Sequence, residues 1–168
     1  MFELKTLSPK AIPAAVDKAL RYRTLNEPEQ AESICEDVLR IDPGHQEALA
    51  MLILARTDRF SAPRPVPVPK ALELVPRLTG AYERAYYEGI IWERQAIALL
   101  RSDVPGCGPR VFESFRKALS CFERAEVVRP AGNDDAVLRW NSCVRMIQAH
   151  PDVRPVEDLA EVGANLGE

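Results

Sequence analysis

Cysteine and histidine are the residues from which catalytic or metal-binding chemistry is usually built, and this chain of 168 residues has four of the first and two of the second. No two cysteines are close enough for a CxxC pair, and His45 and His150 have no further ligand three or four residues away on a predicted helix. We therefore expect no metal site. The cysteines fit small apolar core residues better than a disulfide framework: Cys35, Cys107, Cys121 and Cys143.

Carboxylates are the next candidates, for acid–base catalysis. Glu83, Glu88 and Glu93 share one predicted helix with arginines, and no histidine lies near them in sequence to act as a base. The serines and cysteines lack the glycine pattern of a nucleophile elbow, and the PGCGP stretch at 105–109 lacks the lysine and the preceding strand of a phosphate loop. We expect neither enzymatic activity nor a bound cofactor or small-molecule substrate.

Arginine side chains on the last predicted helix could bind a partner protein. Arg139, Ser142 and Arg145 follow each other at intervals of three, which brings two guanidinium groups near one face of the helix. Such a pair can hold a partner's carboxylate bidentately, and the alternative is a plain solvated surface.

Aromatic residues on the predicted helix 81–101 have two readings, a platform for a ligand or a buried core. Aromatic residues at helical spacing usually form the core, and we expect this for Tyr82, Tyr86 and Trp92, with Tyr87 as the exposed exception. Together with the arginines of the two helices, this gives the predicted partner-binding residues: Tyr87, Arg94, Arg139 and Arg145.

Composition and charge restrict the class of protein. Hydrophobic residues make up 46% of the chain and charged residues 28%, as in an ordinary soluble domain, and the formal net charge is only −3. That charge gives no reason to expect nucleic-acid binding. No apolar run approaches the roughly 20 residues needed to cross a bilayer, and charged residues stand where a signal peptide needs its apolar region. A cytoplasmic protein without membrane contact is predicted.

Apolar residues recur at intervals of three and four wherever they are dense, which predicts an all-α fold. The first helix should run from Pro9 or Ala11 to Thr24. The second should follow from an N-cap at Asn26, with Pro28 in its first turn, and end at Pro43 and Gly44; the third should begin at once and run to about residue 60. Such short connections favour antiparallel helix pairs.

Alternating prolines interrupt the helices in the middle of the chain. Pro63, Pro65, Pro67 and Pro69 predict an extended insertion at 61–69, which could also serve as a polyproline ligand. A short helix over 71–79, kinked or ended by Pro76, should follow. Three longer helices are predicted after it, over 81–101, 110–128 and 134–149.

One packing template occurs twice. In RKALSCFERAEVVRP, at 116–130, a small residue, an aromatic four later, a small residue three later and a proline five later allow two helices to cross closely around one bulky side chain. The earlier copy has cysteine and valine in place of the aromatic and the second small residue. The two copies are Ala31, Cys35, Val38 and Pro43, and Ala118, Phe122, Ala125 and Pro130.

This spacing resembles the second helix of the tetratricopeptide repeat family, whose repeats are helix pairs of 34 residues. Ala19 and Tyr22 stand where the family places a small residue and a tyrosine in the first helix; Gly89 and Trp92 take the equivalent places further on, but 29 residues separate Gly89 from Ala118 where the family has twelve. The resemblance implies antiparallel helix-turn-helix repeats over 1–150, stacked as a short right-handed superhelix. It also implies a scaffold or adaptor that binds a peptide or partner helix on the concave face lined by first helices. The lysine and asparagine positions of the chaperone-binding members are not matched.

The remaining segment, 151–168, is acidic and should form a tail or a short capping helix. Two alternative functions stay open. An RNA-binding repeat would use Arg84, Arg94 and Arg101, although the neighbouring glutamates oppose it. A self-associating subunit, such as a homodimer, would pair the apolar surface of the last helix, unless the tail covers that surface: Trp140, Val144 and Ile147.

Overall fold

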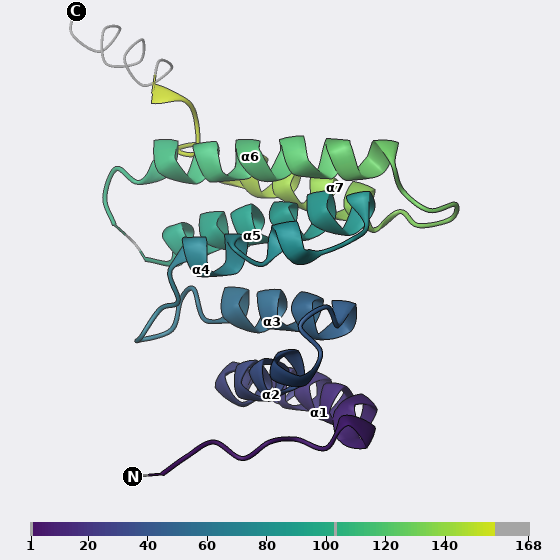
Figure 1. Cartoon of the computed structure of the whole chain (residues 1–168). Coiled ribbons are helices and arrows are strands. Elements are labelled where there is room, and N and C mark those ends of the chain that lie inside the picture. The colour runs from purple at the N-terminus through teal and green to yellow at the C-terminus, as the bar shows by residue number, and fades with distance from the viewer. Residues whose placement is uncertain (1, 103, 157–168) are drawn as a thin grey trace, which may run out of the picture. The chain divides into compact units, whose positions relative to one another are not determined.

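The structure is a computed structural model that describes residues 2–102 and 104–156 (Figure 1). Every regular element in this part of the chain is helical, which confirms the all-α prediction. The chain divides into two compact units, Met1–Gly80 and Ala81–Glu168, called unit 1 and unit 2 below.

Unit 1 begins with two antiparallel helices and a third that packs on them. A single 3-10 turn, η1 (Pro9–Ala11), leads into α1 (Ile12–Thr24), and α2 (Pro28–Ile41) and α3 (Gln46–Asp58) follow after short turns. The imidazole of His45 caps α3, because its Nδ1 accepts a hydrogen bond from the backbone N–H of Ala48 at 3.2 Å. The bounds of α1 and α3 agree with the predicted helices to within about three residues.

The predicted cap of α2 is wrong. Asn26 has a left-handed backbone with φ of 60°, and Glu27 is the N-cap residue of α2. Asparagine tolerates the left-handed region better than other non-glycine residues, so it turns the chain between α1 and α2 and leaves the helix start to Pro28. The helix starts where the proline predicts, but Asn26 shapes the turn instead of capping the helix.

The proline-rich insertion is extended only in part. The helix α4 (Val68–Leu72) already begins within the predicted 61–69 segment, because a proline in the first turn of a helix needs no hydrogen-bond partner, and Pro69 stands there. The helix predicted over 71–79 is two short pieces, since α4 ends at Leu72 and the 3-10 turn η2 (Val75–Arg77) holds Pro76.

The core of unit 1 forms around the first copy of the packing template. Ala31, Cys35 and Val38 on α2 are at most 1% exposed, and Ala19 on α1 is fully buried. On α3, Leu49 and Ile53 are also fully buried. Small residues at the crossing of two helices let the helix axes approach closely, and large aliphatic residues fill the space on either side.

The described residues of unit 2 form three helices: α5 (Ala81–Arg101), α6 (Gly108–Val127) and α7 (Asp135–Ala149). Helix α6 packs against α5 along its length and against α7 on another side (Figure 1). Its start lies two residues before the predicted one, because Pro109 again stands in the first helical turn. The bounds of α5 agree with the predicted helix, and those of α7 differ by one residue.

The second copy of the template is the centre of unit 2. Ala118, Phe122 and Ala125 are at most 1% exposed, and the ring of Phe122 lies directly against Gly89 of α5. A Cβ atom on Gly89 would lie 2.5 Å from Cε1 of that ring, so only glycine allows α5 and α6 to be this close. This is the single bulky side chain between two close helices that the sequence predicts.

The chain after α7 returns to the start of α6. Val153 is 3% exposed, and a Cβ on Gly108 would lie 2.0 Å from the carbonyl oxygen of Asp152. Residues 157–168, most of the predicted tail, lie outside the described residues. In the part of the chain that the structure describes, no helix combines the length and the apolar character needed to cross a bilayer.

Candidate functional site

The four predicted partner-binding residues lie on two helices of unit 2, Tyr87 and Arg94 on α5 and Arg139 and Arg145 on α7. Arg145 is exposed, and Tyr87 and Arg94 are half-buried and interact with other groups of the chain. The structure brings Arg139 to α5, where its Nη1 lies 3.0 Å from Oε2 of Glu93. A binding role for these four residues stays a prediction.

Glu93 is a charged residue of α5 that is only 3% exposed. The other buried residues of this helix are mostly apolar. Burial raises the pKa of its carboxyl group, although the guanidinium groups of Arg139 and Arg94 act in the opposite direction. A buried carboxylate is stable only when it is paired, so Arg139 first serves to neutralise Glu93 inside unit 2. Sequence reasoning missed this pair, because its members are 46 residues apart.

The aromatic residues of α5 form a chain of ring contacts that ends in the core. Tyr82 and Tyr86 stack with ring centroids 5.4 Å apart, and Tyr86 also contacts Tyr87 edge-on and Phe122 at 6.1 Å. Tyr82 is 9% exposed and its hydroxyl group is 3.2 Å from Oδ1 of Asn133. These contacts favour the core interpretation of Tyr82, while Tyr86 and Tyr87 keep part of their rings at the surface.

Three of the four cysteines are buried, which bears on their reactivity. Burial raises the pKa of the Cys35 and Cys143 thiols to about 12 and also raises that of Cys121. A thiol with such a pKa stays protonated at neutral pH, and the thiolate is the reactive form. Among residues 2–102 and 104–156, no three histidine, cysteine, aspartate or glutamate side chains are grouped as metal ligands.

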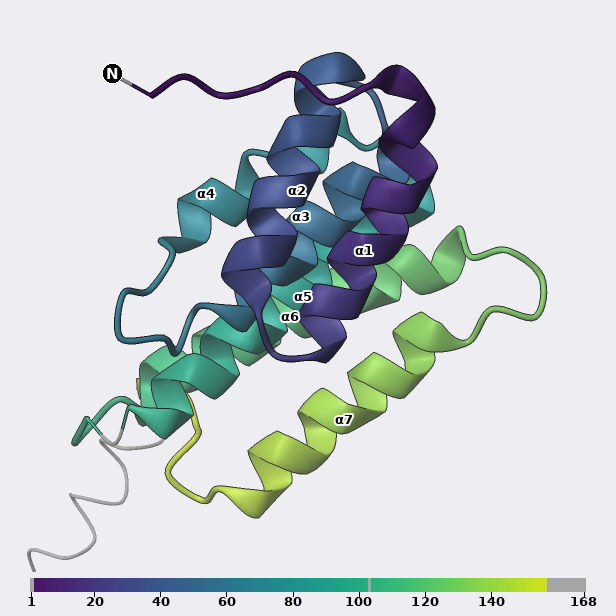
Figure 2. The same cartoon turned by 90° about the horizontal axis from the view of Figure 1, so that it is seen from below.

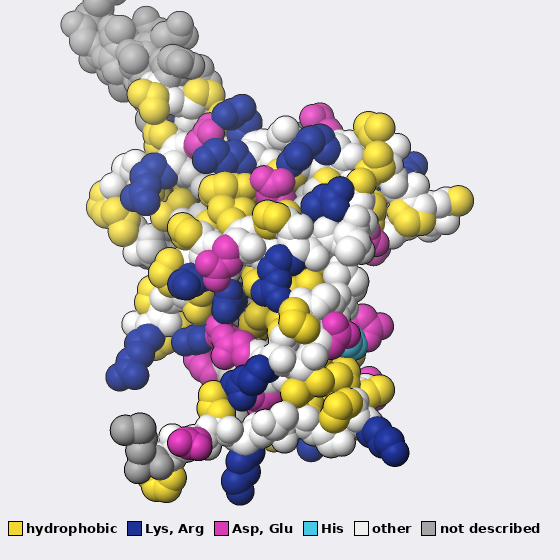
Figure 3. All heavy atoms as spheres, in the orientation of Figure 1, with side chains coloured by type: hydrophobic (Ala, Val, Ile, Leu, Met, Phe, Trp, Pro, Cys, Tyr) yellow, Lys and Arg dark blue, Asp and Glu magenta, His cyan; other side chains and the backbone are white. Residues whose placement is uncertain are grey.

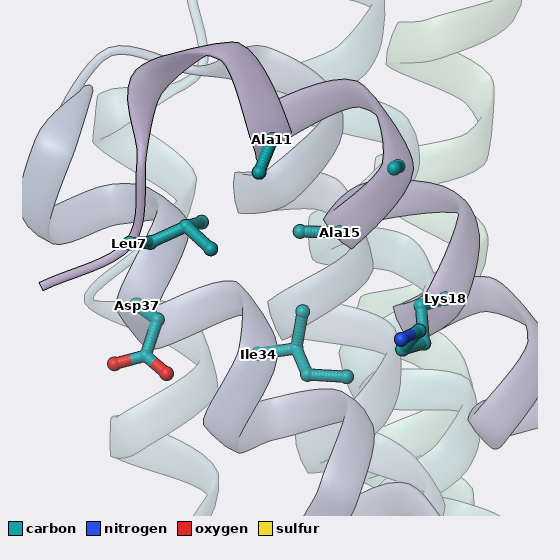
Figure 4. Close-up of a pocket in the computed structure, with 7 residues that line it drawn as sticks. Leu7, Ala11, Ala15, Lys18, Ile34 and Asp37 are labelled. Atoms are coloured by element: carbon teal, nitrogen blue, oxygen red, sulfur yellow. The ribbon is translucent and has the colours of Figure 1, made fainter. Parts of the chain in front are cut away.

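An open apolar groove lies in unit 1, between α1, α2 and the segment before η1. Its volume is about 230 Å³. Figure 4 shows Leu7, Ala15 and Ile34 pointing from these three parts of the chain into the same space. The lining residues are Leu7, Ala11, Ala14, Ala15, Lys18, Ile34 and Asp37.

A second hollow of about 200 Å³ continues the first along α1, since both include Lys18. It adds Arg21, Tyr22 and Leu25, and the side chain of Leu25 is 62% exposed. We call the two hollows together the α1 groove. Figure 2 shows α1 and α2 in front of α3, with the N-terminal segment passing across their upper ends.

The charges of the α1 groove are mainly basic. Lys18 and Arg21 are exposed, and their side chains form no hydrogen bond or ion pair with the residues that the structure describes. Asp37 is half-buried at the α2 side and lies 3.6 Å from Arg40, which offsets its charge. The groove therefore offers an apolar floor with two exposed positive charges, Lys18 and Arg21, and one acid, Asp37, at its rim.

Comparisons with known proteins give no family for the chain: no family model, no curated protein and no solved structure matches it.

Proposed function

We propose that this chain is a non-enzymatic protein-interaction module, built of tetratricopeptide-like helix pairs that stack as a short right-handed superhelix and acting as a cytoplasmic scaffold or adaptor. The observation that carries the proposal is the packing template, whose two copies are equally buried in the two units. Ala31, Cys35 and Val38 on α2 and Ala118, Phe122 and Ala125 on α6 are all at most 1% exposed. Repeated helix pairs of this kind leave extended surfaces that suit partner proteins.

Two surfaces are available for a partner in this proposal. One is the α1 groove, which is open and apolar with a basic rim. The other would be formed by the predicted binding residues of unit 2, Tyr87 and Arg94 on α5 and Arg145 on α7, with Arg139 held against Glu93. Protein interfaces combine apolar contact with arginine and aromatic side chains, and both surfaces offer such a combination.

The RNA-binding alternative has less support. Figure 3 shows acidic and basic side chains interspersed on the face that it presents, with no broad basic area. On α5 and α6, Arg124 is held 2.8 Å from Glu88, so its charge is compensated within unit 2. A nucleic-acid surface needs clustered and uncompensated positive charge.

Affinity capture from the native source, followed by mass spectrometry, tests the proposal. The intact chain should recover a defined protein, also after nuclease treatment of the extract. Lys18→Glu or Arg145→Glu should reduce the yield of this protein, because each reverses an exposed charge on one of the two surfaces. Arg110→Glu, an exposed residue near the start of α6, is the matched control and should leave the yield unchanged. Recovery of RNA alone, or only of further copies of the chain, would contradict the proposal.

A further inference from the structure

Five of the seven residues that line the groove on α1 or next to its ends are spaced as in a helix–helix seam; Ala14 and Arg21 are the other two. Ala11, Ala15, Lys18, Tyr22 and Leu25 follow each other at intervals of four, three, four and three, all within the groove. This is the spacing at which one helix presents a continuous stripe to a second helix lying at a small angle to it. The stripe spans 14 residue steps, or about 21 Å at the helical rise of about 1.5 Å per residue.

This stripe is distinct from the face that α1 uses inside unit 1. Val16 and Ala19 are the buried residues of α1, and Arg23 reaches α3, where its Nε lies 2.6 Å from Oδ2 of Asp58. At about 100° per residue, these three residues lie about a third of a turn round the helix from the middle of the stripe. Helix α1 thus has one face packed against its neighbours and, beside it, a second face with the pattern of a packed helix, which α2 and the segment before η1 flank through Ile34 and Leu7.

The charges at the stripe indicate what kind of helix fits it. Lys18 lies at its centre, and Arg21 lies on the flank away from α2. Asp17 is an acid on the same flank, and Asp37 is near Arg40 at 3.6 Å, so the rim keeps a positive excess. A helix with carboxylates beside its apolar stripe would neutralise Lys18 and Arg21 as it buries the alanines.

A second copy of the chain fits this surface poorly. If two α1 helices paired symmetrically, Lys18 would face Lys18 of the other copy in the parallel register, and also in an antiparallel register centred on the stripe. Like charges at the centre of a helix pair oppose association. The surface therefore favours a different chain.

We propose that the α1 groove binds an amphipathic helix of a partner protein, about four turns long, with small or aliphatic residues at the same alternating spacing and carboxylates on its flanks. This inference rests on the proposed function and specifies the partner for one of its two surfaces. The small side chains of Ala11 and Ala15 let the two helices approach closely, and Tyr22 and Leu25 close the far end of the groove.

Two designed peptides provide the test, measured by fluorescence anisotropy at low salt. Both are capped, helical and of about four turns, with leucine and alanine along the stripe; one has glutamates on its flanks and the other has lysines. The glutamate peptide should bind about tenfold more tightly than the lysine peptide. Two ion pairs that each contribute up to about 1 kcal/mol would produce this difference. The variant with both Lys18→Glu and Arg21→Glu should reverse this preference.

The matched control carries Arg101→Glu and Arg110→Glu, which change the net charge equally at exposed positions of unit 2. It should keep the preference for the glutamate peptide. Ala15→Glu, which places a charge on the groove floor, should abolish binding while the helical circular dichroism persists. Equal binding of the two peptides, no binding of either, or binding unchanged in Ala15→Glu would overturn the inference.

Two further outcomes identify a different occupant and would also overturn it. A dimer in sedimentation velocity that dissociates in Ala15→Glu would assign the groove to a second copy. Binding of the glutamate peptide that appears only after removal of residues 157–168 would assign it to the chain's own C-terminal segment. If the partner captured from the native source is retained by the Ala15→Glu variant, the proposed function stands and only this inference fails.

Discussion

At the scale of single residues, the closest contact in unit 2 depends on the absence of a side chain. Gly89 brings α5 against the ring of Phe122, which is 1% exposed. A larger residue at Gly89 must therefore displace this ring or move the two helices apart. This makes Gly89 the most direct test of the packing template.

Gly89→Ala should lower the free energy of unfolding by about 2 kcal/mol, because overpacking a close helix crossing outweighs the roughly 1 kcal/mol gain in helix propensity. Urea denaturation measures this. Gly44→Ala is the control, since its Cβ would meet only ordinary contact at 3.6 Å, and should change the value by less than about 0.5 kcal/mol. Adding Phe122→Leu should recover part of the loss; a stable Gly89→Ala variant would show that α5 and α6 are not this close.

The buried Glu93 predicts a pH dependence. Its pKa is raised in the folded chain, mainly by burial, so the folded state binds its proton more tightly than the unfolded state does. The contribution of Glu93 to the free energy of unfolding therefore falls as the pH rises from the ordinary pKa of 4.5 through the raised value. Relative to the wild type, Glu93→Gln should gain stability over this window in urea denaturation at a series of pH values.

Glu113 is the matched control for that pH series. Its hydrogen bond with Arg116 lowers its pKa, so its contribution to stability is lost as the pH falls. Glu113→Gln should therefore change the pH dependence of the free energy of unfolding in the opposite direction from Glu93→Gln. The change should be small, because Glu113 lies at the surface. Parallel shifts of the two variants would contradict the assigned burial of Glu93.

At the scale of elements, one arginine of α3 holds the proline-rich segment in place. Arg56 is 11% exposed in its side chain, and its guanidinium group lies 3.1 Å from Glu32 of α2 and 3.1 Å from Glu73 beyond α4. It also donates a hydrogen bond to the backbone carbonyl of Lys70. A single side chain thus joins α2, α3 and α4 within unit 1.

Arg56→Met should loosen this junction and leave Glu32 with Arg59 as its remaining partner. We expect faster protease cleavage within 61–67 and a loss of about 1–2 kcal/mol in the free energy of unfolding. The Arg64→Met variant, changed at an exposed position within the same segment, should be cleaved by the protease as slowly as the wild type. Equal cleavage of the two variants would mean that the prolines alone hold the segment.

The elements also show which features the sequence could predict. Intervals of three and four predicted α1, α3, α5 and α7 closely, because apolar stripes determine where helices can pack. The predicted starts of α4 and α6 are too late, because each helix has a proline in its first turn. The sequence alone does not distinguish such a proline from one that prevents a helix.

Surface features were harder to predict than helices. The signal for the α1 groove was present as a second stripe, Ala11, Ala15, Tyr22 and Leu25, beside the stripe that packs inside unit 1. Alanine and lysine contribute little to an apolar pattern, so the sequence gives this stripe only a weak helix-packing signal. The Glu93–Arg139 pair had no local signal at all, because a salt bridge between distant helices depends on how they pack.

At the scale of the whole molecule, two compact units use one packing template. The template explains the small, aromatic, small and proline pattern in the sequence, and the α1 groove lies outside its buried residues. We propose that the chain works by binding another protein.

The mass of the native complex tests that claim most directly. The chain, isolated from its native source under gentle conditions, should elute in size-exclusion chromatography with light scattering well above its own 18.8 kDa. The excess mass should belong to a different protein, resist nuclease, and be lost in variants that alter the binding surface. A mass equal to one chain, a multiple of 18.8 kDa without a second protein, or an excess removed by nuclease would contradict the claim.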